Sequence, residues 1–284
     1  MDAKIVECPR DAMQGLKEFI PTDVKIRYLN SLLTCGFDTL DFGSFVSPKA
    51  IPQLADTAEV LSGLQMTDTK LLAIIANLRG AETAVLYDEI TYLGFPFSIS
   101  ETFQQRNTNA SQADAFEMVK SIQELCIKHD KILVVYLSMG FGNPYGDVWN
   151  VDIVADWANK MQALGIKIIS LADTVGAAQH VNISYLFKNL IPLYPEVEFG
   201  AHFHTTLTNW QDKVDAAWQS GCRRFDGALK GYGGCPMAKD ELTGNLATEN
   251  LLYYIQNTKI ETNININKFN ESMIMADQIF NRYH

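Results

Sequence analysis

Short runs of apolar, β-branched residues alternate along this chain with longer segments whose apolar residues recur every three or four positions. The runs are typical of buried strands, and the longer segments are typical of helices that bury one face. The predicted strands are residues 4–8, 39–45, 71–77, 90–97, 132–138, 166–172, 197–204 and 223–229. The clearest helical patterns are residues 24–34, 114–128, 152–164, 183–191, 212–219 and 248–255.

Strands that alternate with helices are expected to run parallel, because each crossover helix returns the chain to the same edge of the sheet. Eight such strands are the number that closes a (β/α)8 TIM barrel. We therefore expect one barrel domain over residues 1–284, with a loop and a closing helix after residue 255. An open doubly wound sheet is the alternative. Asp23, Asn182 and Thr248 are the expected N-cap residues of three helices.

The composition narrows the possible partners and compartment. Lys and Arg total 23 against 33 for Asp and Glu, a net charge of −10, which argues against binding to nucleic acid or to an anionic membrane. The five cysteines form no CxxC pair, so we expect neither a disulfide framework nor a structural zinc site. The N-terminus lacks a signal-peptide pattern, and no apolar stretch approaches the ~18 residues that span a membrane. These features predict a cytoplasmic protein.

Polar residues cluster where the predicted strands end, which is where parallel barrels carry their active sites. Arg10 and Asp11 follow the first strand, and Asp41 lies in the second. Asp173 follows the sixth strand, His202 and His204 end the seventh, and Cys235 and Asn245 follow the eighth. Such a collection at one end of the barrel predicts a functional site.

His202 and His204 are two residues apart on a strand, so their side chains emerge from the same face. Together with Asp11 across the barrel mouth they form a candidate site for one divalent cation. Nitrogen and oxygen ligands suit Mn²⁺, Fe²⁺, Co²⁺ or Zn²⁺, and also Mg²⁺ where water and substrate oxygens complete the sphere. The alternative is a pair of inward histidines that hydrogen-bond within the barrel.

The other candidates have more than one interpretation each. Arg10 at the mouth predicts an anion site or an ion pair with Asp11. Asp173 is a candidate base, a partner of another polar group, or a cap of the next helix. Cys235 follows three closely spaced glycines and is either a thiol carried over the site by a mobile loop or a small apolar filler.

Several motifs resemble a known family. The stretches KIVE-CPRDAMQ, GFDTLDFGSFVSPKAIPQLAD, IISLADTVG, GAHFH and GYGGCPMAK with TGNLATENLLYYI resemble the 3-hydroxy-3-methylglutaryl-CoA lyase branch of the DRE-TIM metallolyases. The likeness covers nearly the whole chain, and GGCP followed by TGNLATE is the most specific part. The resemblance implies a TIM barrel, a bound Mg²⁺ or Mn²⁺, an acyl-CoA substrate and a homodimer.

The resemblance also implies roles for individual residues. It assigns metal binding to Asp11, His202, His204 and Asn245. It further implies that Arg10 stabilises an enolate, that Asp173 assists proton removal from a tertiary hydroxyl, and that Cys235 helps to protonate the product carbanion. The implied reaction cleaves 3-hydroxy-3-methylglutaryl-CoA, or a related 3-hydroxy-3-alkyl acyl-CoA, to acetyl-CoA and a 3-oxo acid such as acetoacetate.

The chain departs from the family pattern at a few positions. Asp41 replaces a glutamate, so we expect its hydrogen bond to Arg10 to be rebuilt or bridged by water, and Thr205 replaces an acid. Lys49, Asn77 and Arg79 are candidates for contacts to CoA. Two alternative functions stay open: a metal-dependent enzyme that condenses an acyl-CoA with a 2-oxo acid, or a related aldolase, and a catalytically weakened barrel that binds metal or acyl-CoA.

Overall fold

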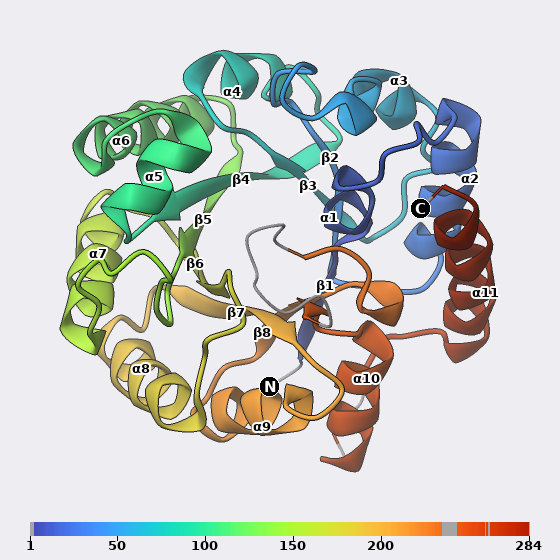
Figure 1. Ribbon diagram of the computed structural model, residues 1–284. Coiled ribbons are helices and arrows are strands. Elements are labelled where there is room, and N and C mark those ends of the chain that lie inside the picture. Colours follow the sequence, from blue (N-terminus) through green and yellow to red (C-terminus); the bar gives the residue numbers. More distant parts are fainter. Residues whose placement is uncertain (1–2, 235–242, 259, 261, 284) are drawn as a thin grey trace.

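Eight parallel strands close into a barrel surrounded by helices in the computed structural model, which describes residues 3–234, 243–258, 260 and 262–283 (Figure 1). Each strand pairs with the next along the chain, and β8 pairs with β1 to close the ring. The predicted TIM barrel is confirmed, and the open sheet is excluded. The barrel strands are β1 Lys4–Glu7, β2 Thr39–Ser44, β3 Lys70–Ile74, β4 Ile90–Ser98, β5 Ile132–Ser138, β6 Ile168–Asp173, β7 Glu198–Thr205 and β8 Arg224–Gly227.

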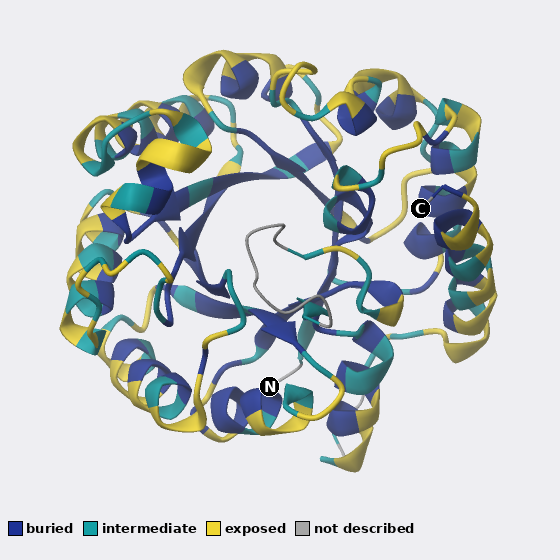
Figure 2. Ribbon diagram, viewed as in Figure 1, coloured by how far each residue is buried: buried dark blue, intermediate teal, exposed yellow. Residues whose placement is uncertain are grey.

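The helices form the outer layer, with one face buried against the strands and the other exposed to solvent (Figure 2), and the buried faces carry apolar residues of the core. Within the described residues they are α1 Pro9–Gln14, α2 Thr22–Leu33, α3 Thr57–Ser62, α4 Leu78–Ala84, α5 Glu101–Thr108, α6 Gln112–Lys128, α7 Val151–Ala163, α8 His180–Leu193, α9 Trp210–Gln219, α10 Thr248–Asn257 and α11 Ile266–Arg282, with 3-10 turns at Pro52–Leu54 and Leu229–Gly231. None of them is long and apolar enough to cross a membrane.

The closing helix after the barrel is also confirmed. Helix α11 packs against α2, where the rings of Tyr28 and Phe280 meet edge to face with centroids 6.2 Å apart. Both side chains are almost completely buried, so α11 covers apolar surface of the barrel that would otherwise face water.

The three predicted N-caps are wrong, because each of those residues lies inside the first turn of its helix. Helix α2 begins at Thr22, so Asp23 instead forms an exposed ion pair with Arg27 one turn later. Helix α8 begins two residues before Asn182, and α10 begins at Thr248 itself. Side-chain caps do occur elsewhere, at Asn77, Ser100, Ser111, Asn150 and Asn265.

One short strand of the described chain was not predicted. Residues Gly244–Asn245 form β9, which runs antiparallel to the end of β7 and pairs Asn245 with His204. The chain leading toward it passes close to α1 at Gly233, where a Cβ atom would lie 2.7 Å from the carbonyl oxygen of Asp11 and 2.9 Å from Nδ2 of Asn245. With a φ of +83°, this position requires glycine both for space and for conformation. This close packing holds Asn245 at the barrel mouth.

Candidate metal centre and active site

Four of the predicted site residues meet at the mouth of the barrel. One ligand atom each from Asp11, His202 and His204 lie within 4.8 Å of one another. Asp11 belongs to α1, directly after β1, whereas both histidines end β7. The amide nitrogen of Asn245 donates to Oδ2 of Asp11 at 2.7 Å and to the carbonyl oxygen of Tyr232 at 2.9 Å. Segments more than 200 residues apart in sequence therefore build one cluster.

His204 has the properties expected of a metal ligand. Its ring is buried, and Nδ1 has no hydrogen-bond partner among the described residues. Burial, helped by the neighbouring His202, lowers the pKa of His204 to about 4, so the imidazole is neutral at physiological pH. A buried polar atom without a partner is costly, and coordination of a cation would satisfy it. The donor set therefore fits a divalent metal.

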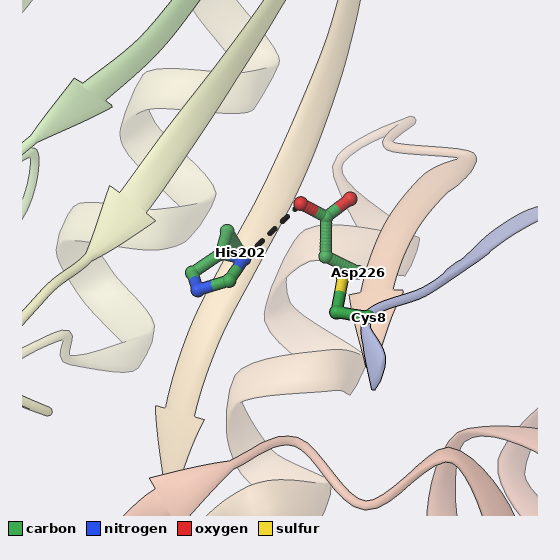
Figure 3. Close-up of side chains that lie close together, drawn as sticks. All are labelled: Cys8, His202 and Asp226. Carbon is green, nitrogen blue, oxygen red and sulfur yellow. Dashed lines mark hydrogen bonds and ion pairs between the residues drawn. The ribbon is translucent and has the colours of Figure 1, made fainter. Parts of the chain in front are cut away.

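His202 is held by a carboxylate behind it. Its Nδ1 lies 3.1 Å from Oδ2 of Asp226 on β8, while the other ring nitrogen points away from this pair (Figure 3). Burial opposes protonation of His202, but the hydrogen bond and charge of Asp226 raise its pKa overall. A carboxylate on the rear nitrogen of an imidazole is the usual support of a metal-binding histidine, because it fixes the ring and its tautomer.

Asp226 was missed at the level of the sequence. It lies in the predicted eighth strand, and in the barrel it stands next to His202 in register on the neighbouring strand. An aspartate in the middle of a predicted buried strand was the available signal, since buried carboxylates are rare without a partner.

Asp11 is the negatively charged member of the cluster. Its burial favours the neutral acid, but the guanidinium of Arg10 and the two histidines outweigh that effect and lower the pKa of Asp11 to about 2. Asp11 is therefore ionised at neutral pH, as a carboxylate ligand must be.

Arg10 lies between two carboxylates. Its Nη1 donates to Oδ1 of Asp11 and to Oε1 of Gln14, both at 2.9 Å, and its Nη2 donates to Oδ2 of Asp41 at 2.6 Å. Of the two alternatives expected for Asp41, the structure shows a rebuilt direct hydrogen bond and not a bridge through water, because Arg10 reaches the shorter carboxylate itself. Helix α1 begins only two residues after β1 ends, which brings the guanidinium over the adjacent strand β2. Burial raises the pKa of Asp41 to about 6, against the opposing effect of Arg10.

Asp173 is turned into the structure rather than toward open space. It is 1% exposed, and its oxygens accept from Nζ of Lys213 at 2.6 Å and from the amide of Ala178 at 2.8 Å. The same Nζ donates to the carbonyl oxygen of His204 at 2.8 Å. Lys213, a buried lysine of α9 that sequence reasoning missed, therefore links Asp173 to the backbone of His204.

The structure also describes four further residues that the sequence singled out, and it leaves one undescribed. Asn77 caps α4 by accepting from the amide of Gly80, and Lys49 and Arg79 are exposed. Thr205 is buried at the end of β7, where it pairs with Gly244. Cys235 lies outside the described residues.

The strands form a closed parallel barrel, and imidazole, carboxylate and guanidinium groups gather at its mouth. This combination defines a TIM-barrel enzyme whose side chains are suited to bind a metal ion. The family model described as HMGL-like matches residues 4–274, almost the entire barrel with most of its closing helix. The chain belongs to this family of carbon–carbon lyases, as its motifs predicted.

Curated relatives agree with this assignment. The mitochondrial hydroxymethylglutaryl-CoA lyase of Mus musculus is 32% identical over 98% of this chain and 86% of its own length. A 3-hydroxy-3-isohexenylglutaryl-CoA/hydroxymethylglutaryl-CoA lyase of Pseudomonas aeruginosa is 35% identical over 91% of this chain and 86% of its own length. Among solved structures, an HMG-CoA lyase of Acinetobacter baumannii in complex with coenzyme A and 3-methylmalate superimposes with a TM-score of 0.91, at 33% identity, covering 99% of this chain and 92% of the other.

Proposed function

We propose that this chain cleaves 3-hydroxy-3-methylglutaryl-CoA, or a related 3-hydroxy-3-alkyl acyl-CoA, to acetyl-CoA and a 3-oxo acid such as acetoacetate, with Mg²⁺ or Mn²⁺ as cofactor. The observation that carries the proposal is the convergence of Asp11, His202 and His204 within 4.8 Å, with Arg10 bonded to the first of them at 2.9 Å. The relatives that act on such thioesters, and the neighbour that binds coenzyme A, support the substrate class.

Four residues would hold the metal. Asp11 offers a carboxylate oxygen, and each histidine offers a ring nitrogen. The amide nitrogen of Asn245 is already engaged as a donor, which leaves its amide oxygen as the ligand atom. When bound, a divalent cation supplies Lewis-acid polarisation of the substrate's hydroxyl and carboxylate oxygens.

Arg10 is positioned to stabilise the charge that develops on the thioester. Its contacts to Asp11, Gln14 and Asp41 engage four of the five N–H groups of the guanidinium and leave one on Nη2. When the bond between C2 and C3 breaks, the electron pair moves onto the acetyl-CoA fragment as an enolate. A fixed N–H aimed at that oxygen stabilises the enolate without any reorganisation at the moment of reaction.

Two further residues complete the proton transfers of the proposed reaction. The tertiary hydroxyl passes its proton to water at the barrel mouth, which starts the cleavage, and Asp173 assists by holding Lys213 and, through it, the backbone of His204. The enolate carbon then takes up a proton to give acetyl-CoA, and we assign the donor role to the thiol of Cys235.

A substrate panel tests the proposed reaction. Purified protein with Mn²⁺ is incubated separately with 3-hydroxy-3-methylglutaryl-CoA, with 3-hydroxy-3-isohexenylglutaryl-CoA, and with acetyl-CoA plus a 2-oxo acid. The proposal predicts release of acetyl-CoA from at least one of the first two substrates, and their ratio identifies the preferred C3 substituent. Consumption of acetyl-CoA in the third reaction, without release in the others, would identify a condensing enzyme instead.

The proposed location is the cytoplasm, and the proposed assembly is a homodimer. Both stay predictions from the sequence and its resemblance. Cell fractionation and light scattering of the purified protein check them.

A further inference from the structure

A second group of metal-ligating side chains lies behind His202, on the side opposite the first cluster. One ligand atom each from Cys8, His202 and Asp226 lie within 4.8 Å of one another (Figure 3). The three residues come from the adjacent strands β7 and β8 and from the end of β1, so the barrel itself fixes their spacing. Cys8 is 1% exposed and Asp226 is 2% exposed.

These side chains retain unused bonding capacity. Oδ1 of Asp226 is buried and has no hydrogen-bond partner in the described part of the chain. The thiol of Cys8 makes a weak contact of 3.7 Å with the carbonyl oxygen of Val6. Burial and the negative charges of Asp226, Asp41 and Asp11 raise the pKa of this thiol, against the positive charge of Arg10. A negative field and unsatisfied ligand atoms both favour a bound cation.

We propose that Cys8, Asp226 and Nδ1 of His202 form a separate site for a thiophilic divalent cation of the Zn²⁺ class, and that its occupancy inhibits the enzyme by displacing the catalytic metal. A sulfur, nitrogen and oxygen ligand set suits Zn²⁺ and Cd²⁺ and is unfavourable for Mg²⁺. The inhibition, though not the binding, rests on the proposed function of the first cluster.

The distances permit this coordination with a small contraction. Around a tetrahedral ion with bonds of 2.0–2.3 Å, neighbouring ligand atoms are separated by about 3.3–3.8 Å. Nδ1 of His202 and Oδ2 of Asp226 are already 3.1 Å apart, and since all three atoms lie within 4.8 Å of one another, the contraction needed at the sulfur is at most about 1.5 Å. On binding, the cation takes the place of the proton between His202 and Asp226, and the thiol of Cys8 releases its proton to solvent.

The shared imidazole makes the two sites mutually exclusive. A neutral imidazole has one nitrogen with a free lone pair, and the other nitrogen carries the proton. In the present structure Nδ1 faces Asp226, which leaves the opposite nitrogen for the Asp11 and His204 cluster. A cation on Nδ1 moves the proton to that opposite nitrogen, so His202 can no longer serve as a ligand of the catalytic metal.

Cadmium tests the binding, because a cadmium–thiolate bond gives an ultraviolet charge-transfer band. Metal-free protein is titrated with Cd²⁺ as wild type and as Cys8→Ala, Cys126→Ala and Cys235→Ala. Cys126 is an equally buried cysteine in α6 and serves as the matched control. We expect the band in wild type, Cys126→Ala and Cys235→Ala, and its loss in Cys8→Ala. A band that survives Cys8→Ala, or that disappears in Cys235→Ala, overturns the site.

X-ray absorption of zinc in the Cys235→Ala protein gives an answer that does not depend on how well the Cys8 variant folds. The site predicts one sulfur ligand at about 2.3 Å with nitrogen and oxygen ligands beside it. A shell of nitrogen and oxygen alone contradicts it.

Competition tests the inhibition separately. The apparent Kd for Cd²⁺, read from the band, is expected to rise at least tenfold when Mn²⁺ saturates the first cluster. A Kd that does not change with Mn²⁺ refutes the mutual exclusion. If the protein shows no lyase activity while the Cys8-dependent band remains, the proposed function fails and the thiophilic site stands.

Discussion

The guanidinium of Arg10 contacts the carboxylate of Asp41 directly, with Nη2 only 2.6 Å from Oδ2 and Nε within 3.2 Å of both carboxylate oxygens. Both side chains are buried, so the pair is shielded from solvent. The shorter acid at this position therefore does not release the arginine. Hydrogen bonds fix the plane of the Arg10 guanidinium, to Asp41 along one edge and to Asp11 and Gln14 along the other.

Arg10→Lys tests this arrangement. A lysine keeps the charge but loses the planar set of donors, so it cannot satisfy Asp41 and Asp11 in the same geometry. We expect kcat to fall by about 10²–10³, with a much smaller change in KM, because the lost interaction is made to the developing enolate. Steady-state kinetics check this. Arg27→Lys, in an exposed ion pair of α2, is the control and is expected to leave kcat unchanged. A kcat within twofold of wild type in Arg10→Lys contradicts the role.

Asp226→Asn tests the support of His202. The amide keeps the size of the side chain but loses the charge behind Nδ1, so the ring is less well oriented and a poorer ligand. We expect Mn²⁺ affinity, measured by calorimetry, to fall by about 10–100-fold. Asp277→Asn, a partly exposed carboxylate paired with Lys230, is the control and should bind Mn²⁺ as wild type does. Equal affinities for the two variants would show that Asp226 does not tune the site.

The sequence predicted the strands, and the meeting of the candidate ligands Asp11, His202 and His204 at the barrel mouth, because local patterns determine both. The two-residue spacing of His202 and His204 on a strand places both on one face, and a closed barrel brings Asp11 opposite them. Asp226 and Lys213 could not be assigned, since their roles depend on register and on the facing helix, which are tertiary properties. The predicted N-caps were wrong because helix ends depend on preceding residues that the apolar pattern does not reveal.

Lys213→Met tests the ion pair beneath His204. The substitution leaves the carboxylate of Asp173 buried without its cation, and breaking such a pair costs about 3–5 kcal/mol of the free energy of unfolding. Adding Asp173→Asn removes the unpaired charge and should restore part of the loss. Urea unfolding gives the free energy of unfolding of wild type, of Lys213→Met and of the double variant. Lys268→Met, in an exposed pair with Glu271, should change stability by less than about 1 kcal/mol. A similar small effect for Lys213→Met would rule out the strong buried pair.

Glu7 predicts a dependence of stability on pH. Burial raises its pKa from 4.5 to about 8, although Thr248 and the amide of Leu229 donate hydrogen bonds to it. Between these two values the folded protein holds a proton that the unfolded chain has lost. The stability associated with neutral Glu7 is therefore complete below pH 4.5 and declines as pH rises through 8, by up to ~1.4 kcal/mol per pH unit.

Glu7→Gln removes this titration and keeps an oxygen for the amide of Leu229. The variant is expected to gain stability relative to wild type as pH rises from 5 to 8. Thermal unfolding at several pH values checks this. Parallel curves for the two proteins would mean that Glu7 does not keep its proton in the fold.

The central claim is that a cation held by Asp11, His202, His204 and Asn245 is required for cleavage of the acyl-CoA. The most direct measurement is acetyl-CoA release from 3-hydroxy-3-methylglutaryl-CoA by wild type and by His204→Ala, with chelator and after addition of Mn²⁺ or Mg²⁺. We predict that chelation abolishes release by wild type, that either metal restores it, and that a folded His204→Ala protein is inactive under both conditions. Turnover by His204→Ala in the presence of chelator would contradict the account.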